Sequence, residues 1–160
     1  IDINQERPKS LGSVKLKNSD PTEYPLIDPN YFSDPRDLEE LVKGVGVMRE
    51  IMSQNEISQY INKEIHPWLN SNTRSEIIEA IKITAYTGHH PCSTAKMGAK
   101  NDPMAVLDEN LKVRGLNGLR VCDASAMPTQ ITGNLYATVL AMAEKAADII
   151  LDKPPLKENL

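Results

Sequence analysis

The residues of this sequence best suited to proton transfer stand in a stretch of small side chains and one proline, 88–98, which is predicted to be a loop. His89 and His90 lie there, and histidine is the usual general base near neutral pH because its pKa lies close to the working range. Small neighbouring side chains allow a ligand to approach such a histidine closely. Loop histidines are also common as structural or simply exposed residues, so the local pattern alone indicates only a candidate base.

A second set of polar residues stands where predicted elements begin or end. Asn134 precedes the last predicted helix, where its amide can donate to a substrate oxygen or merely cap the helix, a position that favours asparagine. Asp123 ends a predicted buried strand and can cap the following turn. It can also orient a ligand beside the backbone N–H groups of Asp123 and Ala124, since such groups bind anions such as phosphate. A buried strand followed by a loop and a helix is where α/β folds bind ligands.

Several common catalytic and binding motifs are missing from the sequence. It contains no G-x-G-x-x-G dinucleotide motif, no P-loop and no G-x-S-x-G nucleophile motif. Cys92 and Cys122 are the two cysteines, and together with three histidines they match no zinc pattern, so we expect no metal site. We expect both to be buried free thiols, although a disulfide stays open. His66, the third histidine, is predicted to lie on the surface, and nearby Trp68 is predicted to be a packing anchor.

Composition and charge limit the classes of partner. The net charge is −4 with acidic and basic residues well mixed, and without a stripe rich in Lys and Arg we expect no nucleic-acid partner. No run of about 18 apolar residues exists, so we expect no membrane span, and no signal peptide is visible. The first residue is Ile1 rather than Met, which leads us to expect a missing or removed upstream segment and favours a processed or secreted protein. A length of 160 residues fits one domain or two partial ones.

The elements that must position these residues are mostly helices with clear start signals. Ser-Asp-Pro at 33–35 begins a helix predicted over 35–53, whose apolar residues recur on one face. The capping-box pattern at 73–76 predicts a second helix that ends before Gly88, and an alanine-rich helix is predicted over 137–151. The other predicted elements are short strands: 13–17, 25–29, 106–108, 111–113 and 119–123.

Three blocks of sequence stand in a fixed order along the chain. The first is RPKSLGSV at 7–14 with DPNY at 28–31, and the second is HPCSTAKMG at 90–98. The third has five pieces: VLD at 106–108, GLRVCDAS at 118–125, MP at 127–128, GN at 133–134 and AEKAAD at 143–148. In order and spacing, these blocks resemble the C-terminal region of the glucose–methanol–choline (GMC) flavin oxidoreductases, and the resemblance covers almost the whole chain.

The resemblance implies an α+β fold made from parts of two domains. Residues 1–87 would be the C-terminal part of a substrate-binding domain, an antiparallel sheet with helices. Residues 88–160 would be the closing segment of an FAD-binding α/β domain, with its last strand, its last helix and the catalytic loop residues. The family's N-terminal FAD fold, with its glycine motif, is missing here. The resemblance therefore implies that a partner chain or a missing segment supplies the nucleotide site, and that the isolated chain is inactive.

The resemblance also implies an FAD-dependent alcohol oxidase or dehydrogenase, in which a hydride passes from the alcohol carbon to the flavin. The family's base maps onto His90, which would accept the hydroxyl proton. Its second active-site residue maps onto Asn134, which would hydrogen-bond the substrate oxygen. Asp123 and Ala124 would lie along the ribityl–diphosphate chain of FAD, and the backbone at Asn134 and Leu135 would approach the edge of the flavin ring.

Some positions depart from the family pattern, and two other functions stay open. Ser93 stands where most members have glycine, and many members have asparagine and proline near Tyr136 and Thr138, differences that bear on the substrate more than on the reaction. One alternative is an FAD-containing lyase of the hydroxynitrile-lyase kind, which binds FAD without using it for redox chemistry. The other is a non-catalytic storage or structural protein on the same fold. The presence of both His90 and Asn134 favours the enzyme.

Overall fold

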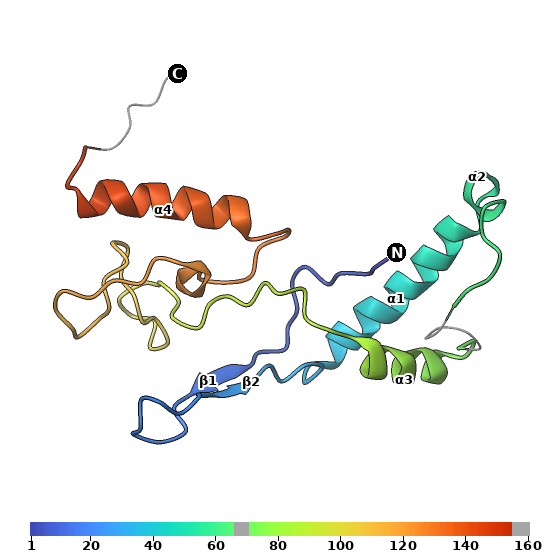
Figure 1. The fold of residues 1–160 in the computed structure, drawn as a ribbon, viewed down its shortest axis with the longest axis horizontal. Coiled ribbons are helices and arrows are strands. Elements are labelled where there is room, and N and C mark those ends of the chain that lie inside the picture. Colours follow the sequence, from blue (N-terminus) through green and yellow to red (C-terminus); the bar gives the residue numbers. More distant parts are fainter. Residues whose placement is uncertain (66–70, 155–160) are drawn as a thin grey trace. The chain divides into compact units, whose positions relative to one another are not determined.

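The computed structural model describes residues 1–65 and 71–154, and the chain divides into two compact units, Ile1–Gly88 and His89–Leu160 (Figure 1). The division falls one residue beyond the predicted domain boundary. The assignment of each unit to a particular domain of a larger protein stays a prediction.

The chain has the predicted α+β character. In chain order the elements are β1 (Ser13–Lys15), β2 (Leu26–Asp28), α1 (Pro35–Met52), α2 (Asn55–Ser58), α3 (Arg74–Thr84), the short 3-10 helix η1 (Ala124–Ala126) and α4 (Tyr136–Ile150). Across the two described ranges, no helix has the length and apolar character needed to cross a membrane. His66 and Trp68 lie outside the described residues, so their predicted places are not tested.

Local signals fix the starts of the two longer helices in the first unit. Asp34 caps α1 by accepting a hydrogen bond from the backbone N–H of Arg36, and Pro35 occupies the first turn, where its missing N–H costs nothing. Thr73 and Glu76 form a complete capping box at the start of α3. The two helices pack against each other (Figure 1). Both predicted helices are therefore confirmed, while the short α2 between them was not predicted.

The core of the first unit is small and lies between these two helices. Val45 of α1 is fully buried, and α3 contributes Ala80 and Ile81. Ile83, which the sequence pattern placed on the apolar side of α3, is 78% exposed, so that part of the prediction is wrong. Two positions along a helix correspond to a rotation of about 200°, which turns Ile83 away from the side occupied by Ile81.

A small antiparallel hairpin completes the first unit. β1 and β2 pair with Val14 opposite Ile27, which confirms the two predicted strands in shortened form. A Cβ atom at Gly12 would lie 2.3 Å from the backbone oxygen of Asp28, so only glycine fits where the chain enters the hairpin.

A buried carboxylate joins the N-terminal segment to α1. Asp37 lies in the first turn of that helix and is 1% exposed. The side-chain amide of Gln5 and the backbone N–H of Lys9 donate to its Oδ1, both at 2.8 Å. Ser10 donates to Oδ2 from its backbone N–H at 2.8 Å and from its hydroxyl at 2.5 Å. Burial alone would raise the pKa of Asp37, but the hydrogen bonds, led by that from the Ser10 hydroxyl, outweigh it and hold the pKa below its ordinary value of 3.8.

Replacing Asp37 by asparagine is expected to lower the free energy of unfolding by about 3 kcal/mol, because the amide group turns a hydrogen-bond donor toward buried donors and removes the charge they stabilise. Glu40→Gln is the matched control. Glu40 lies on the same helix and also accepts from Gln5 at 2.8 Å, but it is exposed. Its replacement is expected to cost less than about 0.5 kcal/mol. Urea unfolding followed by circular dichroism measures both.

The pH dependence of this stabilisation has a definite sign. Because the folded pKa of Asp37 is depressed, the stabilisation is fully present above the ordinary value of 3.8 and is lost as the pH falls through the lower folded value. The stability gap between the wild type and Asp37→Asn should therefore narrow below that pH. A gap that stays constant from neutral pH to well below 3.8 would contradict the assignment.

The second unit is mostly loop, and α4 covers it (Figure 1). Its buried cluster consists of Leu107, Leu111 and Ala126 from the loops and η1, together with Ala146 from α4. The helix predicted over 137–151 is confirmed, with a shift of one residue at each end. The apolar loop residues therefore have a helix to pack against, and this fixes the loops that carry the candidate site.

The short strands predicted in the second unit are wrong as regular elements. The three segments 106–108, 111–113 and 119–123 contribute only isolated bridges. Arg120 pairs with Lys112 alone, and Leu119 is 48% exposed, so the last segment is not the buried strand that was predicted. Gly118, with a φ of 77°, turns the chain just before this segment, and the side chain of Asp123 at its end caps η1. Too few residues remain between them to extend a ladder.

Candidate functional site

His90, which is half-buried, begins a loop that runs beside η1. Three backbone hydrogen bonds hold this loop: Ser93 N–H to Ala124 O at 3.2 Å, Ala95 N–H to Ser125 O at 2.9 Å, and Met97 N–H to Ala126 O at 2.9 Å. The partners advance together along both segments, so the two run in the same direction. Two segments that the sequence marked as functional, and that lie far apart in it, are therefore neighbours.

Two residues near His90, one before it and one after it in the sequence, have backbone conformations that are unfavourable for residues with a Cβ atom. His89 has a φ of 59° and Ser93 a φ of 68°. Non-glycine residues occupy this left-handed region at a cost of about 1–2 kcal/mol each. Glycine would adopt the conformation of Ser93 without this cost. Strain of this kind persists where the surrounding structure enforces it, and functional loops are a usual place for it.

Replacing Ser93 by glycine is expected to raise the free energy of unfolding by about 1 kcal/mol, because glycine adopts the left-handed conformation without a steric penalty. Ser75→Gly is the control, since Ser75 is an exposed residue in the first turn of α3. Glycine there should destabilise by about 0.5 kcal/mol. Thermal unfolding shows whether each replacement raises or lowers the stability. A lower stability for Ser93→Gly would show that the loop is not strained at this residue.

The charged groups in the second half of the loop are matched locally. Lys96 pairs with Asp102 at 2.7 Å, and this hydrogen bond is the main cause that lowers the pKa of the Asp102 carboxyl. A guanidinium nitrogen of Arg114 donates to the backbone oxygen of Gly98 at 2.7 Å. These contacts fix the far end of the loop.

Asp123 caps the 3-10 turn. Its carboxylate accepts hydrogen bonds from the backbone N–H and the hydroxyl of Ser125, at 2.8 and 2.5 Å. The capping alternative raised by the sequence is thus realised. Within the described part of the chain, the backbone N–H groups of Asp123 and Ala124 donate no hydrogen bond. They remain able to bind an anionic ligand such as a diphosphate.

Asn134 does not cap α4. The capping position belongs to Leu135, and no side chain makes a cap hydrogen bond there. Leu135 is 5% exposed and anchors the start of the helix, whereas the side chain of Asn134 is exposed. The helix-capping alternative for Asn134 is therefore wrong. Its amide stays available for a ligand.

A side-chain hydrogen bond joins the two loops that carry His90 and Asn134. The Sγ of Cys92 lies 2.8 Å from the Oε1 of Gln130. Cys92 follows His90 by two positions, and Gln130 precedes Asn134 by four. The structure therefore connects the loop of His90 both to Ala124 and to the segment that leads into Asn134.

Sequence reasoning missed Gln130 and Asp37. Gln130 carries no local signal, because its partner is remote in the sequence. Asp37 does carry a weak one, since acidic residues are favoured in the first turn of a helix, but nothing local indicates its burial.

The cysteines are free, as expected, and both are half-buried rather than fully buried. Among the residues that the structure describes, no group of three or more His, Cys, Asp or Glu side chains is placed to hold a metal ion.

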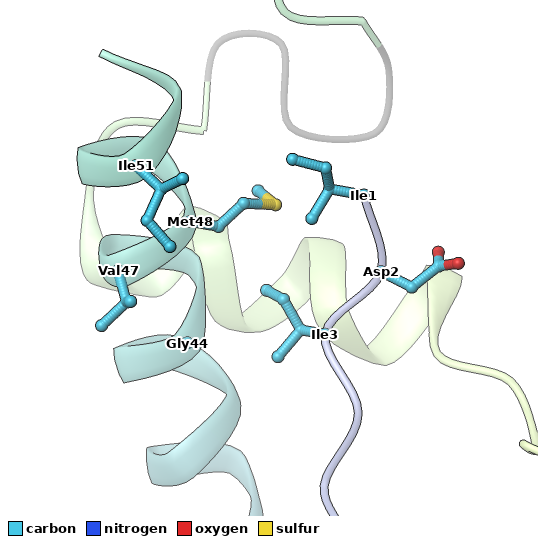
Figure 2. Close-up of a pocket in the computed structure, with 7 residues that line it drawn as sticks. All are labelled: Ile1, Asp2, Ile3, Gly44, Val47, Met48 and Ile51. Atoms are coloured by element: carbon cyan, nitrogen blue, oxygen red, sulfur yellow. The ribbon is translucent and has the colours of Figure 1, made fainter. Parts of the chain in front are cut away.

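An apolar hollow in the first unit is distinct from these residues. It has a volume of about 310 Å³ and is lined mainly by Ile1, Ile3, Gly44, Val47, Met48 and Ile51. Figure 2 shows Ile1 and Ile3 directed toward α1, while the carboxylate of Asp2 points away. Among the residues that line it, only Asp2 carries an acid–base side chain, and its carboxylate is directed away, so we do not take the hollow as the candidate active site.

The chain belongs to the GMC oxidoreductase family, whose model matches residues 8–143. It is 40% identical over 156 residues to oxygen-dependent choline dehydrogenase of Vibrio vulnificus, and the match covers 98% of this chain and 28% of that protein. The chain thus spans little more than a quarter of the length of this relative.

Solved structures agree with this assignment. Pyridoxine 4-oxidase from Mesorbium loti has a TM-score of 0.84 at 34% identity, over 94% of this chain and 29% of that one. An FAD-dependent oxidoreductase from Chaetomium thermophilum has a TM-score of 0.81 at 31% identity, over 88% of this chain and 24% of that one. The predicted family and fold class are therefore confirmed.

Proposed function

We propose that this chain is the C-terminal part of an FAD-dependent alcohol oxidase or dehydrogenase and that it carries the residues that act on the alcohol. The observation that supports this most is the convergence of three segments. The loop after His90 is hydrogen-bonded to the turn that begins at Ala124, and through Cys92 to the segment that leads into Asn134. These are the segments that a base, an oxyanion donor and a cofactor contact would occupy.

His90 acts as the general base in this proposal. It accepts the hydroxyl proton of the alcohol, which leaves a developing alkoxide. The negative charge on the oxygen favours departure of a hydride from the adjacent carbon. When bound, FAD supplies the acceptor for that hydride. General-base catalysis of this kind contributes roughly 10²–10⁴-fold in rate.

Asn134 donates a hydrogen bond to the same oxygen. Because its amide is not used to cap α4, it can stabilise the alkoxide without loss to the helix. An oriented donor to a developing oxyanion contributes roughly 10²–10³-fold. The two side chains thus act on one atom, the first by removing its proton and the second by stabilising the charge that remains.

In our proposal, the main contacts with FAD come from the backbone of the turn between the two loops. The backbone N–H groups of Asp123 and Ala124 fit the anionic ribityl–diphosphate part of FAD, since neither donates elsewhere in the described chain. The backbone at Asn134 and Leu135 would lie at the edge of the flavin ring. Leu135 is held rigidly by its burial, which suits that role.

Choline is the first substrate to test, because a relative at 40% identity is named as a choline dehydrogenase. The full-length protein that contains this chain would be purified and mixed with choline, and then with other primary alcohols, without oxygen. Bleaching of the bound yellow flavin supports the proposal. A protein that binds flavin and is bleached by none of these alcohols would instead favour the lyase alternative. A full-length protein without flavin would favour the storage or structural alternative.

The rest of the nucleotide site comes from outside this chain in our proposal, either from another segment or from a partner chain. We expect residues 1–160 expressed alone to retain no FAD and to oxidise no alcohol, because the dinucleotide motif that binds the diphosphate is not in this sequence. Flavin absorbance after gel filtration measures retention, with the full-length protein as control. Stoichiometric FAD on the isolated chain would overturn this expectation.

A further inference from the structure

We propose that Cys92 and Gln130 are positioning residues, whose hydrogen bond holds the loop of His90 in register with the segment that carries Asn134. The inference rests on the proposed function, because it concerns the placement of the base and the oxyanion donor. In this inference the two side chains act through the positions of His90 and Asn134, and not on the alcohol or the cofactor.

The geometry gives the thiol a defined orientation. Cys92 donates to the Oε1 of Gln130 at 2.8 Å and accepts from the hydroxyl of Ser93 at 3.3 Å. All three side chains are half-buried. A thiol that both donates and accepts is fixed more firmly than a free one, so it can act as a link between loops.

This link holds a part of the loop that the backbone leaves free. The backbone hydrogen bonds of the loop begin at Ser93, and the structure describes none from 90–92. On the other side, Gln130 is the residue of the 128–132 stretch whose described hydrogen bond reaches another segment. The Cys92–Gln130 hydrogen bond therefore joins these two stretches directly.

Backbone strain on both sides of His90 explains why this loop needs the Cys92–Gln130 link. His89 and Ser93, on either side of the stretch, have positive φ values. A strained loop relaxes unless other contacts oppose it, and relaxation would move His90. A displacement of about 1 Å in a catalytic group can cost up to roughly 10²-fold in rate, whereas the loss of a single neutral hydrogen bond corresponds to roughly fivefold. We therefore expect an intermediate effect of about tenfold.

A double-mutant cycle on the FAD-loaded full-length protein tests the link. Cys92→Ala and Gln130→Met each remove one partner, and a third variant combines them. Each single change is expected to slow flavin reduction by choline about tenfold while flavin content and KM stay the same. The double variant should be no slower than the slower single variant, because the same contact is lost once. Cys92→Ser is expected to restore most of the rate, since a hydroxyl can donate to the same amide oxygen.

A second measurement reads the contact without catalysis. In Gln130→Met, Cys92 loses its acceptor and should be alkylated by iodoacetamide several times faster than in the wild type. Cys122 serves as the internal reference, because its thiol faces the backbone oxygen of Met142 and not this pair. Mass spectrometry of the two cysteine peptides gives both rates from one sample.

The outcomes separate this inference from the proposed function. If no alcohol bleaches the wild-type flavin, the proposed function fails and the positioning role fails with it, while alkylation still reports on the contact. If the wild type is active and His90→Ala is slow, but the Cys92 and Gln130 variants match the wild type, only this inference is overturned. Multiplied losses in the double variant would also overturn it. So would a Cys92→Ser variant as slow as Cys92→Ala, or loss of flavin from both.

Discussion

Replacing His90 by alanine in the full-length protein is expected to slow flavin reduction by an alcohol roughly 10²–10⁴-fold. Without the imidazole, the hydroxyl proton has no fixed acceptor, and hydride departure must begin from the neutral alcohol. Flavin content should hardly change, because the proposed cofactor contacts are backbone groups at Asp123, Ala124, Asn134 and Leu135 and do not include His90. Anaerobic stopped-flow measurement of the flavin absorbance gives the rate directly and separates it from reoxidation.

The neighbouring histidine provides the control. His89→Asn removes an adjacent imidazole and keeps a residue that tolerates the left-handed conformation at φ 59°. It is expected to change the rate by less than about threefold, as asparagine preserves the local backbone. If His89→Asn is as slow as His90→Ala, the base is not specific to His90. If His90→Ala loses flavin and rate in equal measure, the residue is structural.

Replacing Asn134 is expected to give the second largest loss, roughly 10²–10³-fold in flavin reduction. Asn134→Ala removes the amide donor, and Asn134→Asp removes it while adding a negative charge beside the developing alkoxide. The aspartate variant should therefore be at least as slow as the alanine variant. Asn134→His retains a donor and should lose less.

Stability measurements distinguish this role from helix capping. If Asn134 were a cap, alanine would destabilise α4 by about 1 kcal/mol and aspartate would not. In the structure the cap position belongs to Leu135 and lacks a side-chain hydrogen bond, so neither variant should change the thermal midpoint. Equal stability with reduced rate supports the oxyanion role. Reduced stability in the alanine variant alone would restore the capping alternative.

The sequence predicted the helices well because their signals are local. The start of α1 depends on Asp34 and Pro35, which are neighbours in the chain, and the capping box of α3 spans four residues. Hydrogen bonds of this kind form within the segment that encodes them. The strand predicted at 119–123 failed for the opposite reason. A strand needs bonded neighbours, and this segment has only the bridge between Arg120 and Lys112.

For the candidate site, too, local sequence decided some features and the tertiary structure decided others. The sequence by itself determined which residue types could do the chemistry, and the order of its blocks placed His90, Asn134 and Asp123 within one family pattern. It left the choice between capping and ligand binding open. Only the tertiary structure decided that Asp123 caps its turn and that Asn134 does not cap α4.

Contacts between segments that lie far apart in the sequence were decided by the tertiary structure alone. Cys92 and Gln130 meet across 38 positions, and Asp37 is held by Ser10 across 27. No periodicity or capping rule reports on pairs so distant, because such contacts exist only after the segments between them have folded. Local sequence thus specified the elements and the chemistry of the residues, whereas packing specified which side chains remain free to act.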